Sequence, residues 1–99
     1  MVILERSFHA KGETVTLRVE KPKPDGADFR CEYAIEGGGL ERRSYGMGVD
    51  SIQALLLALS RAHLDLLCAR RDGGLSLMWL DMRDLGLPLP DNSKASDFD

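Results

Sequence analysis

The sequence predicts an α+β domain in which one long helix covers one face of an antiparallel sheet. Three observations support this class. Apolar residues recur at every second position in several segments before residue 48, but at every third and fourth position between Ile52 and Ala69. Turns rich in glycine and proline separate the alternating segments. We therefore expect a four-strand meander, then one long helix, then a final strand.

The alternating segments predict four strands before the helix. Val15–Val19 and Phe29–Ile35 each place apolar side chains on one face and mostly polar ones on the other, and residues 2–9 and 40–45 show this pattern less clearly. Short turns connect the strands, at Lys11–Gly12, Pro22–Gly26 and Gly37–Gly39. Because parallel neighbours need a long crossover, these short connections indicate antiparallel pairing.

The helix is expected to begin directly after Asp50. Asp50 is a good N-cap, and Gln53 three residues later completes a capping-box pattern. Arg70 and Arg71 suit the negative end of the helix dipole. One apolar face, here called the main stripe, should lie on the sheet; it consists of Ile52, Leu55, Leu56, Leu59, Ala62, Leu66 and Ala69.

The segment after the helix predicts a final strand and then an irregular end. Residues 75–80 alternate as a strand would, with leucines and a tryptophan on one face. Residues 85–90 contain two prolines, and residues 91–99 are mostly polar and acidic. We therefore expect a single α+β domain over residues 1–90 and a flexible acidic tail over residues 91–99.

The composition argues against several classes of function. The formal net charge of -3 leaves no excess of Lys and Arg for a phosphate backbone, so nucleic-acid binding is not expected. The longest apolar run, Ala54–Leu59, is much shorter than the roughly 20 residues that span a membrane. Cys31 and Cys68 lack the spacing of a metal site or a disulfide framework. These features predict a cytoplasmic protein that binds no metal and no cofactor.

The run Gly48–Leu59, GVDSIQALLLAL, raises an alternative role for Ser51. Asp-Ser-Ile before an apolar helix resembles the attachment site of acyl and peptidyl carrier proteins, where the serine carries a phosphopantetheine arm. That resemblance implies a small helical bundle, whereas the residues before Ser51 alternate with period two. We expect Asp50 to cap the helix and Ser51 to stay unmodified. The alternative is a phosphopantetheine carrier with Ser51 as its attachment site.

The remaining polar residues and glycines predict no catalytic site. Ser60 and His63 lie three positions apart on the predicted helix, but Asp65 would point away from His63. No Gly-x-Ser-x-Gly motif surrounds a serine. Gly46 and Gly48 precede the helix, but the Lys-Ser/Thr pair of a phosphate-binding loop is absent. We therefore interpret these glycines as turn residues.

A second apolar stripe on the helix predicts an interface. Leu57, Leu64 and Cys68 lie seven and four positions apart, well away from the main stripe. A helix that covers a sheet needs one apolar face, so either the Leu85–Leu89 segment or a second subunit should cover this second stripe. We predict that Leu57, Leu64 and Cys68 contact either another protein or a second copy of the chain in a homodimer.

Two resemblances add to this interpretation. Tyr45–Leu59, together with Trp79 and Gly86–Pro88, resembles an uncharacterised family of small bacterial proteins that shares a Gly-Val-Asp-Ser-x-Gln-Ala-Leu helix start. It implies an α+β fold, a bacterial origin and no activity. The order of strands, helix and strand is similar to the partially formed RNase H-like modules of HicB-type antitoxins, although their Pro-Gly-Cys turn is absent. A toxin-neutralising antitoxin or immunity module is therefore a second alternative to a non-enzymatic, protein-binding or self-associating module.

Overall fold

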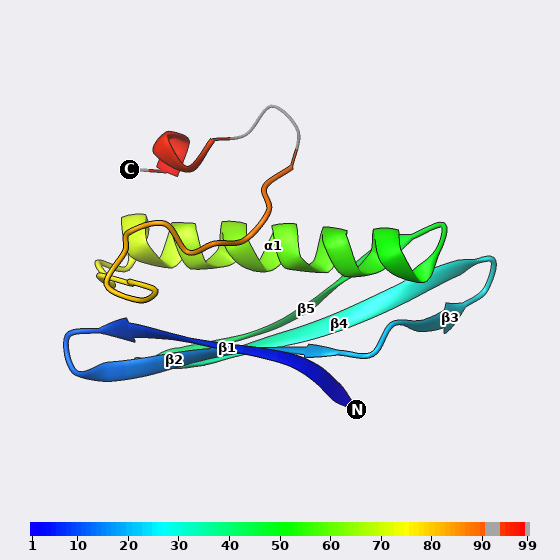
Figure 1. Cartoon of the computed structure of the whole chain (residues 1–99), viewed down its shortest axis with the longest axis horizontal. Helices are drawn as coiled ribbons and strands as arrows, with labels where there is room; N and C mark the ends of the chain where they lie inside the picture. The colour runs from blue at the N-terminus through cyan, green and yellow to red at the C-terminus, as the bar shows by residue number, and fades with distance from the viewer. Residues whose placement is uncertain (91–93, 99) are drawn as a thin grey trace.

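The computed structural model of the chain describes residues 1–90 and 94–98. Five strands precede one long helix, and a short 3-10 helix follows near the end (Figure 1). Their bounds are β1 Val2–Ala10, β2 Glu13–Glu20, β3 Lys23–Asp25, β4 Asp28–Gly37, β5 Leu40–Gly48, α1 Ser51–Asp72 and η1 Ala95–Phe98. The helix lies on one face of an antiparallel sheet, which confirms the predicted α+β class.

The sheet is a meander with β4 at its centre. β1 pairs with β2 and β2 with β4, while β5 pairs with β4 along its whole length on the other side. β3 falls inside the predicted Pro22–Gly26 turn and pairs with the start of β4, beyond the end of β2. It can contain Pro24 because it has a strand neighbour on one side only, so the missing amide breaks no ladder.

Helix α1 lies unusually close to β5, and two glycines make this approach possible. A Cβ atom on Gly46 would lie 2.4 Å from the backbone nitrogen of Ala58, and one on Gly48 would lie 2.4 Å from that of Ala54. Both glycines lie within β5 and not in a turn, so their interpretation as turn residues was wrong. Their role is to leave room for the helix backbone.

This close approach changes which side of α1 faces the sheet. The helix turns the small residues Ala54, Ala58 and Ala62, all fully buried, inward. In the predicted main stripe, Ile52 is 68% exposed and Leu56 is 50% exposed. Ile52 and Leu56 are therefore turned away from their predicted position at the sheet, because large side chains would not fit between two backbones in contact. Ala62 and Leu66 of the same stripe are fully buried, as predicted.

The predicted final strand over residues 75–80 is replaced by two isolated bridges, one between Met78 and β1 and one between Trp79 and Met82. Met78 exchanges two backbone hydrogen bonds of 2.9 Å with His9 of β1, and the chain then turns back on itself. The turn contains Leu80 and Asp81, whose φ angles are +51° and +63°. Left-handed backbone at two successive residues ends any extended run, so the ladder stops there.

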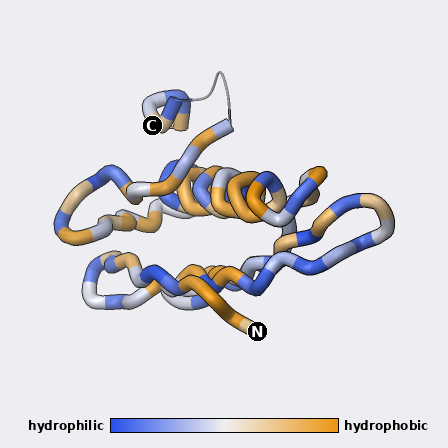
Figure 2. Tube along the Cα trace, turned by 45° about the vertical axis from the view of Figure 1, so that its right-hand side comes forward, coloured by the Kyte–Doolittle hydropathy of each residue, from blue (hydrophilic) through white to orange (hydrophobic). Residues whose placement is uncertain are grey.

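Residues 75–90, here called the strap, then pass along the C-terminal half of α1 (Figure 1). The core lies between α1, the strap and the inner face of the sheet. Figure 2 shows hydrophobic segments on both sides of this space. The largest fully buried side chains are Phe8, Val15, Leu17, Val19, Cys31, Tyr33, Ile35, Leu66, Leu67, Leu77 and Leu85.

The end of the chain returns to α1. Phe98 of η1 packs against the edge of the core, and the Arg71 guanidinium lies 5.6 Å from its ring centre. The predicted tail over residues 91–99 lies partly outside the described residues. Helix α1 itself is long and apolar enough to cross a membrane by length and composition alone, a test that core helices of soluble proteins also pass. Its contacts with β5 are those of a core helix.

Candidate functional site

The start of α1 is built as a capped helix end. The Asp50 carboxylate accepts a hydrogen bond of 2.8 Å from the Gln53 amide, and the Gln53 side-chain oxygen accepts one of 2.7 Å from the Val49 amide. The first bond satisfies a backbone donor that the start of the helix leaves unpaired, and the second holds the residue that precedes the N-cap. The predicted cap is confirmed. Ser51 is the first residue of the helix and is exposed.

The polar residues of the second half of α1 do not meet. His63 is buried, and its Nδ1 atom lies 3.0 Å from the Pro88 carbonyl oxygen of the strap. Asp65 lies towards the sheet and accepts a hydrogen bond from the Tyr33 hydroxyl of β4. The His63 ring therefore contacts the strap, while the Asp65 carboxylate contacts the sheet. His63 and Asp65 therefore bind different parts of the fold.

Asp65 joins three elements. Besides the Tyr33 hydroxyl, its carboxylate contacts the Arg42 guanidinium of β5 at 3.3 Å. Burial, and then the hydrogen bond with Asp65, raise the pKa of Tyr33 to about 12. The phenol therefore stays protonated and acts as a donor. We interpret this group as a structural link between α1 and the sheet, because its members already satisfy one another.

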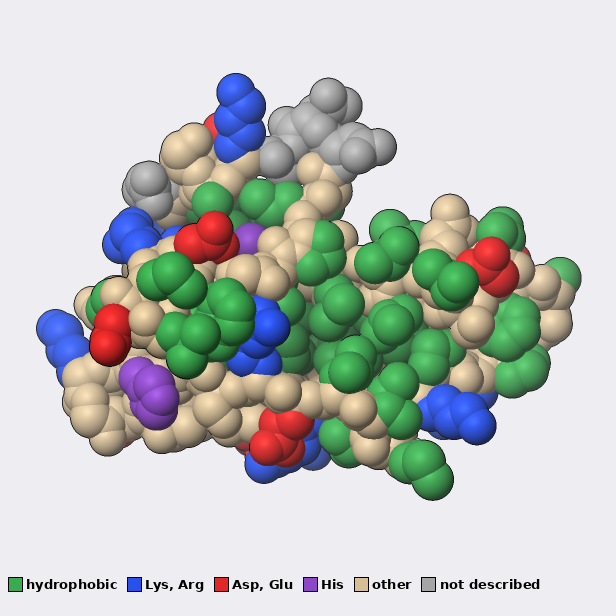
Figure 3. All heavy atoms as spheres, viewed as in Figure 1, with side chains coloured by type: hydrophobic (Ala, Val, Ile, Leu, Met, Phe, Trp, Pro, Cys, Tyr) green, Lys and Arg blue, Asp and Glu red, His purple; other side chains and the backbone are tan. Residues whose placement is uncertain are grey.

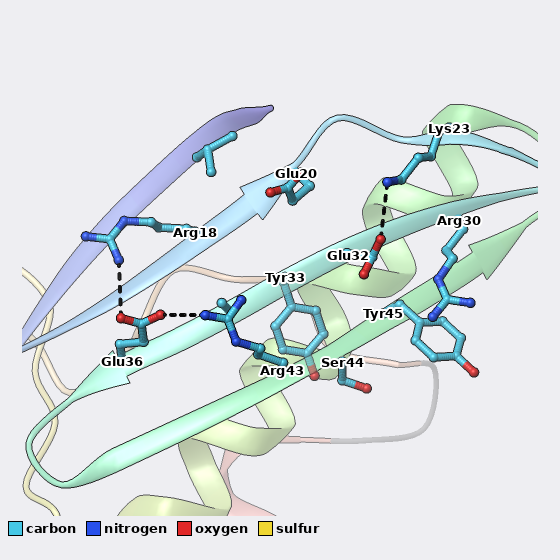
Figure 4. Close-up of a pocket in the computed structure, with 12 residues that line it drawn as sticks. Arg18, Glu20, Lys23, Arg30, Glu32, Tyr33, Glu36, Arg43, Ser44 and Tyr45 are labelled. Carbon is cyan, nitrogen blue, oxygen red and sulfur yellow. Dashed lines mark hydrogen bonds and ion pairs between the residues drawn. The ribbon is translucent and has the colours of Figure 1, made fainter.

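The outer face of the sheet carries a network of opposite charges. Arg18 and Arg43 both contact the Glu36 carboxylate, at 3.8 and 3.2 Å, as Figure 4 shows. The Arg30 guanidinium stacks over the Tyr45 ring at 3.8 Å, and the whole group surrounds a shallow hollow of about 680 Å³. Both signs of charge alternate here, so no single charged ligand is favoured. This face is a solvated charge network, in which each exposed pair contributes little stability.

Two of the three predicted interface residues, Leu57 and Leu64, lie beside β5. Leu57 is 43% exposed, whereas Leu64 and Cys68 are half-buried. Leu57 and Leu64 line a mainly apolar hollow of about 330 Å³ with Tyr45 and Met47 of β5; Gly46, Ser60, Arg61 and Pro90 complete its lining. The strap contacts His63, roughly 120° around the helix from Leu57. The end of the strap, at Pro90, reaches the hollow but leaves Leu57 exposed.

A second uncovered apolar surface lies at the N-terminal half of α1. Figure 3 shows hydrophobic side chains gathered over this half and over the space between it and the sheet. Its most exposed members are Val49, Ile52 and Leu56. The strap covers the corresponding side of the C-terminal half only, through contacts such as that between His63 and Pro88. We call Val49, Ile52 and Leu56 the open ridge.

The start of β1 is a third uncovered apolar surface, and the sequence did not single it out. Met1 is almost fully exposed, and Val2, Ile3 and Leu4 are each 43 to 45% exposed. Figure 2 shows this hydrophobic run extending away from the body of the molecule. The signal available in the sequence was four consecutive apolar residues ahead of a weakly alternating strand. We call Met1–Leu4 the β1 run.

No metal centre is seen in the part of the chain that the structure describes, where no three His, Cys, Asp or Glu side chains are placed to hold an ion. Burial raises the pKa of the Cys31 thiol to about 11, with the nearby Glu20 and Glu32 carboxylates adding to the effect. Such a thiol stays protonated and unreactive.

Comparison with known proteins gives one match. A family model described as "Domain of unknown function (DUF6968)" matches residues 4–89. The chain belongs to this family. No curated protein and no solved structure matches it significantly. The DUF6968 match covers the whole sheet except the first residues of β1, the whole of α1 and nearly all of the strap. It agrees with the expected uncharacterised family and adds no activity.

Proposed function

We propose that this DUF6968 domain is a non-enzymatic, cytoplasmic binding module of bacterial origin whose partner is a second copy of itself. One observation supports this proposal above others. Four consecutive apolar residues of the β1 run are each more than two-fifths exposed at the edge of the sheet. Monomeric soluble proteins rarely leave such a surface uncovered.

Self-association would cover these apolar surfaces without requiring a different protein as partner. A two-fold axis buries the same patch on both copies, so the patch needs to match only itself. A two-fold axis brings each charged group near its own copy, so a patch with charges of one sign would repel itself. An uncharged apolar patch is therefore suited to symmetric association. The β1 run contains no charged side chain, and neither does the open ridge.

Neither alternative has a specific observation in its favour. A carrier would need helices before Ser51, whereas five strands precede it. The antitoxin similarity depended on a strand after the helix, and that strand is reduced to the bridge between His9 and Met78. The bond from the Gln53 amide to Asp50 explains the start of the helix, and the packing of α1 on the sheet explains the layout of the strands.

Sedimentation velocity over a wide range of protein concentration tests the proposal. We expect a concentration-dependent shift from the mass of one chain to the mass of two. A single species with the mass of one chain, even at the highest concentration, would exclude self-association.

A further inference from the structure

The outer edge of β1 has unpaired backbone groups. His9 directs its amide and carbonyl away from β2, because both bond to Met78 at 2.9 Å. In a strand the direction of these groups alternates, so Ser7 and Glu5 direct theirs to the same edge. Among the described residues, the bonds of His9 with Met78 are the only backbone bonds on this edge. The edge is free from Ser7 towards the start of the strand.

We propose that this free edge pairs antiparallel with the same edge of a second copy, with Leu4 opposite Leu4 on the two-fold axis. The inference rests on the proposed function and specifies its interface. The two sheets then join into one through β1. Backbone hydrogen bonds hold the joint, and the β1 run supplies the apolar surface that the joint buries.

The geometry limits the possible registers. Opposite residues in an antiparallel pair must both direct their backbone groups to the joint, or both away from it, so the axis passes through a residue. An axis at Glu5 places two carboxylates opposite each other, and an axis at Arg6 places two guanidinium groups there, which is unfavourable. An axis closer to His9 is blocked by Met78. The axis at Leu4 avoids both conflicts and brings two apolar side chains together, and unlike an axis at Val2 or Ile3 it lies on the regular side of the bulge between Val2 and Leu4.

The charged residues of this edge are already engaged within their own chain. Glu5 accepts a hydrogen bond of 3.0 Å from Arg18 of β2. Arg6 donates to the carbonyl oxygens of Leu85 and Gly86, and its guanidinium lies 3.9 Å from the centre of the Trp79 ring. These side chains point to the two faces of the sheet. Neither therefore prevents another strand from pairing at the edge, as the exposed lysines of many edge strands do.

Two other features of this edge bear on the proposal. The Lys21 amide bonds to the Met1 carbonyl at 2.9 Å, which holds the start of the strand against β2. A bulge between Val2 and Leu4 adds one residue to β1. Bulges are one means by which edge strands resist pairing, so the decisive test measures the pairing directly.

Disulfide cross-linking of two matched variants provides that test. In the proposed register, the two Leu4 Cα atoms lie about 4.5 Å apart, within the range that a disulfide spans. The two Ser7 Cα atoms lie six residues apart along the joint, on the order of 20 Å. Both variants, Leu4→Cys and Ser7→Cys, carry Cys68→Ser, while the buried Cys31 is retained.

We expect Leu4→Cys to form a covalent dimer during mild oxidation and Ser7→Cys to stay uncross-linked. If wild-type protein sediments as a dimer but Leu4→Cys cross-links no faster than Ser7→Cys, the pairing is wrong and self-association stands. A monomeric wild type overturns both the pairing and the proposed function.

A second pair of variants distinguishes an interface at β1 from an interface on the surface of α1. Leu4→Lys places two ammonium groups on the axis and should give a folded monomer, because Leu4 is already partly exposed. Leu57→Glu combined with Leu64→Glu should leave the dimer intact, with circular dichroism confirming that both proteins are folded. The opposite pattern, a dimeric Leu4→Lys and a monomeric double variant, places the interface on the predicted Leu57 and Leu64 stripe and overturns the β1 pairing.

Discussion

Gly46 of β5 lies directly against Ala58 of α1, so close that a Cβ atom on the glycine would lie 2.4 Å from the alanine amide nitrogen. Gly48 and Ala54 repeat this contact one helical turn earlier. The contact brings two backbones together and sets the rotation of α1. Through that rotation it determines which leucines the helix buries and which it leaves exposed.

Gly46→Ala should destabilise the protein by about 1–3 kcal/mol, as overpacking of a tight contact does. The φ angle of Gly46 is not in the left-handed region, so steric conflict with α1 and not backbone strain accounts for the loss. Urea unfolding monitored by circular dichroism measures it. Gly12→Ala is the comparison for backbone strain alone, because Gly12 has a φ of +83° and a Cβ atom added there would lie in open space. A Gly46→Ala protein as stable as wild type would mean that α1 lies farther from β5.

Asp50→Ala should cost about 0.5–2 kcal/mol, because it removes the acceptor for the Gln53 amide. Ser51→Ala should have a much smaller effect, since its exposed hydroxyl has no role in the cap. Thermal or urea unfolding of the two variants gives the comparison. Incubation with coenzyme A and a broad-specificity phosphopantetheinyl transferase should leave the mass of the wild type unchanged. A mass gain that Ser51→Ala abolishes would instead support the carrier alternative.

Leucine truncations along α1 should follow the observed rotation of the helix. Leu66 is fully buried, so Leu66→Ala should cost about 2–5 kcal/mol. Leu59, which the main stripe placed at the sheet, is only half-buried against the core, and Leu59→Ala should cost less. Leu56→Ala should cost least in the monomer. Equal losses at all three positions in urea unfolding would contradict the assigned rotation.

Acid should weaken the packing of the strap through His63. Burial is the main cause that lowers the pKa of His63 below its usual value of 6.5, and the nearby Arg70 acts in the same direction. The Pro88 and Leu87 carbonyl groups and the Asp84 carboxylate oppose the shift without cancelling it. Because the unfolded chain then binds the proton more readily than the folded one, stability should fall as pH drops below about 6.5.

His63→Gln removes this titration and should flatten the dependence of unfolding free energy on pH between about pH 7 and pH 5. The comparison uses the slope and not the absolute stability, because a buried glutamine has its own cost. Urea unfolding at several pH values measures both. An equally steep slope in the variant would assign the acid sensitivity to other groups.

The features that the sequence predicted well are local. The cap depends on Asp50 and Gln53, which lie within one helical turn, so their spacing alone indicates the contact. The alternation within residues 15–19 and 29–35 likewise reports which face of each strand is buried. These patterns led to the correct fold class and to the correct start of α1.

The features that it predicted poorly depend on contacts between distant segments. The rotation of α1 is set by Gly46 and Gly48. The sequence of the helix itself does not indicate that two glycines of β5 will face it. The alternation of residues 75–80 gave no sign that Leu80 would adopt left-handed backbone and end the strand. The exposure of the β1 run depends on how far the strap reaches, which periodicity does not encode.

Amide hydrogen exchange at β1 tests the central claim, self-association through the sheet edge, most directly. In the proposed register the Glu5 amide lies opposite Ile3 of the second copy, and among the described residues it has no backbone partner within its own chain. The nearby His9 amide bonds to Met78 and serves as the internal reference. We predict that Glu5 is protected at concentrations where the protein is dimeric, and that this protection is lost on dilution while that of His9 persists. Rapid exchange at Glu5 in a sample that sediments as a dimer would contradict the account.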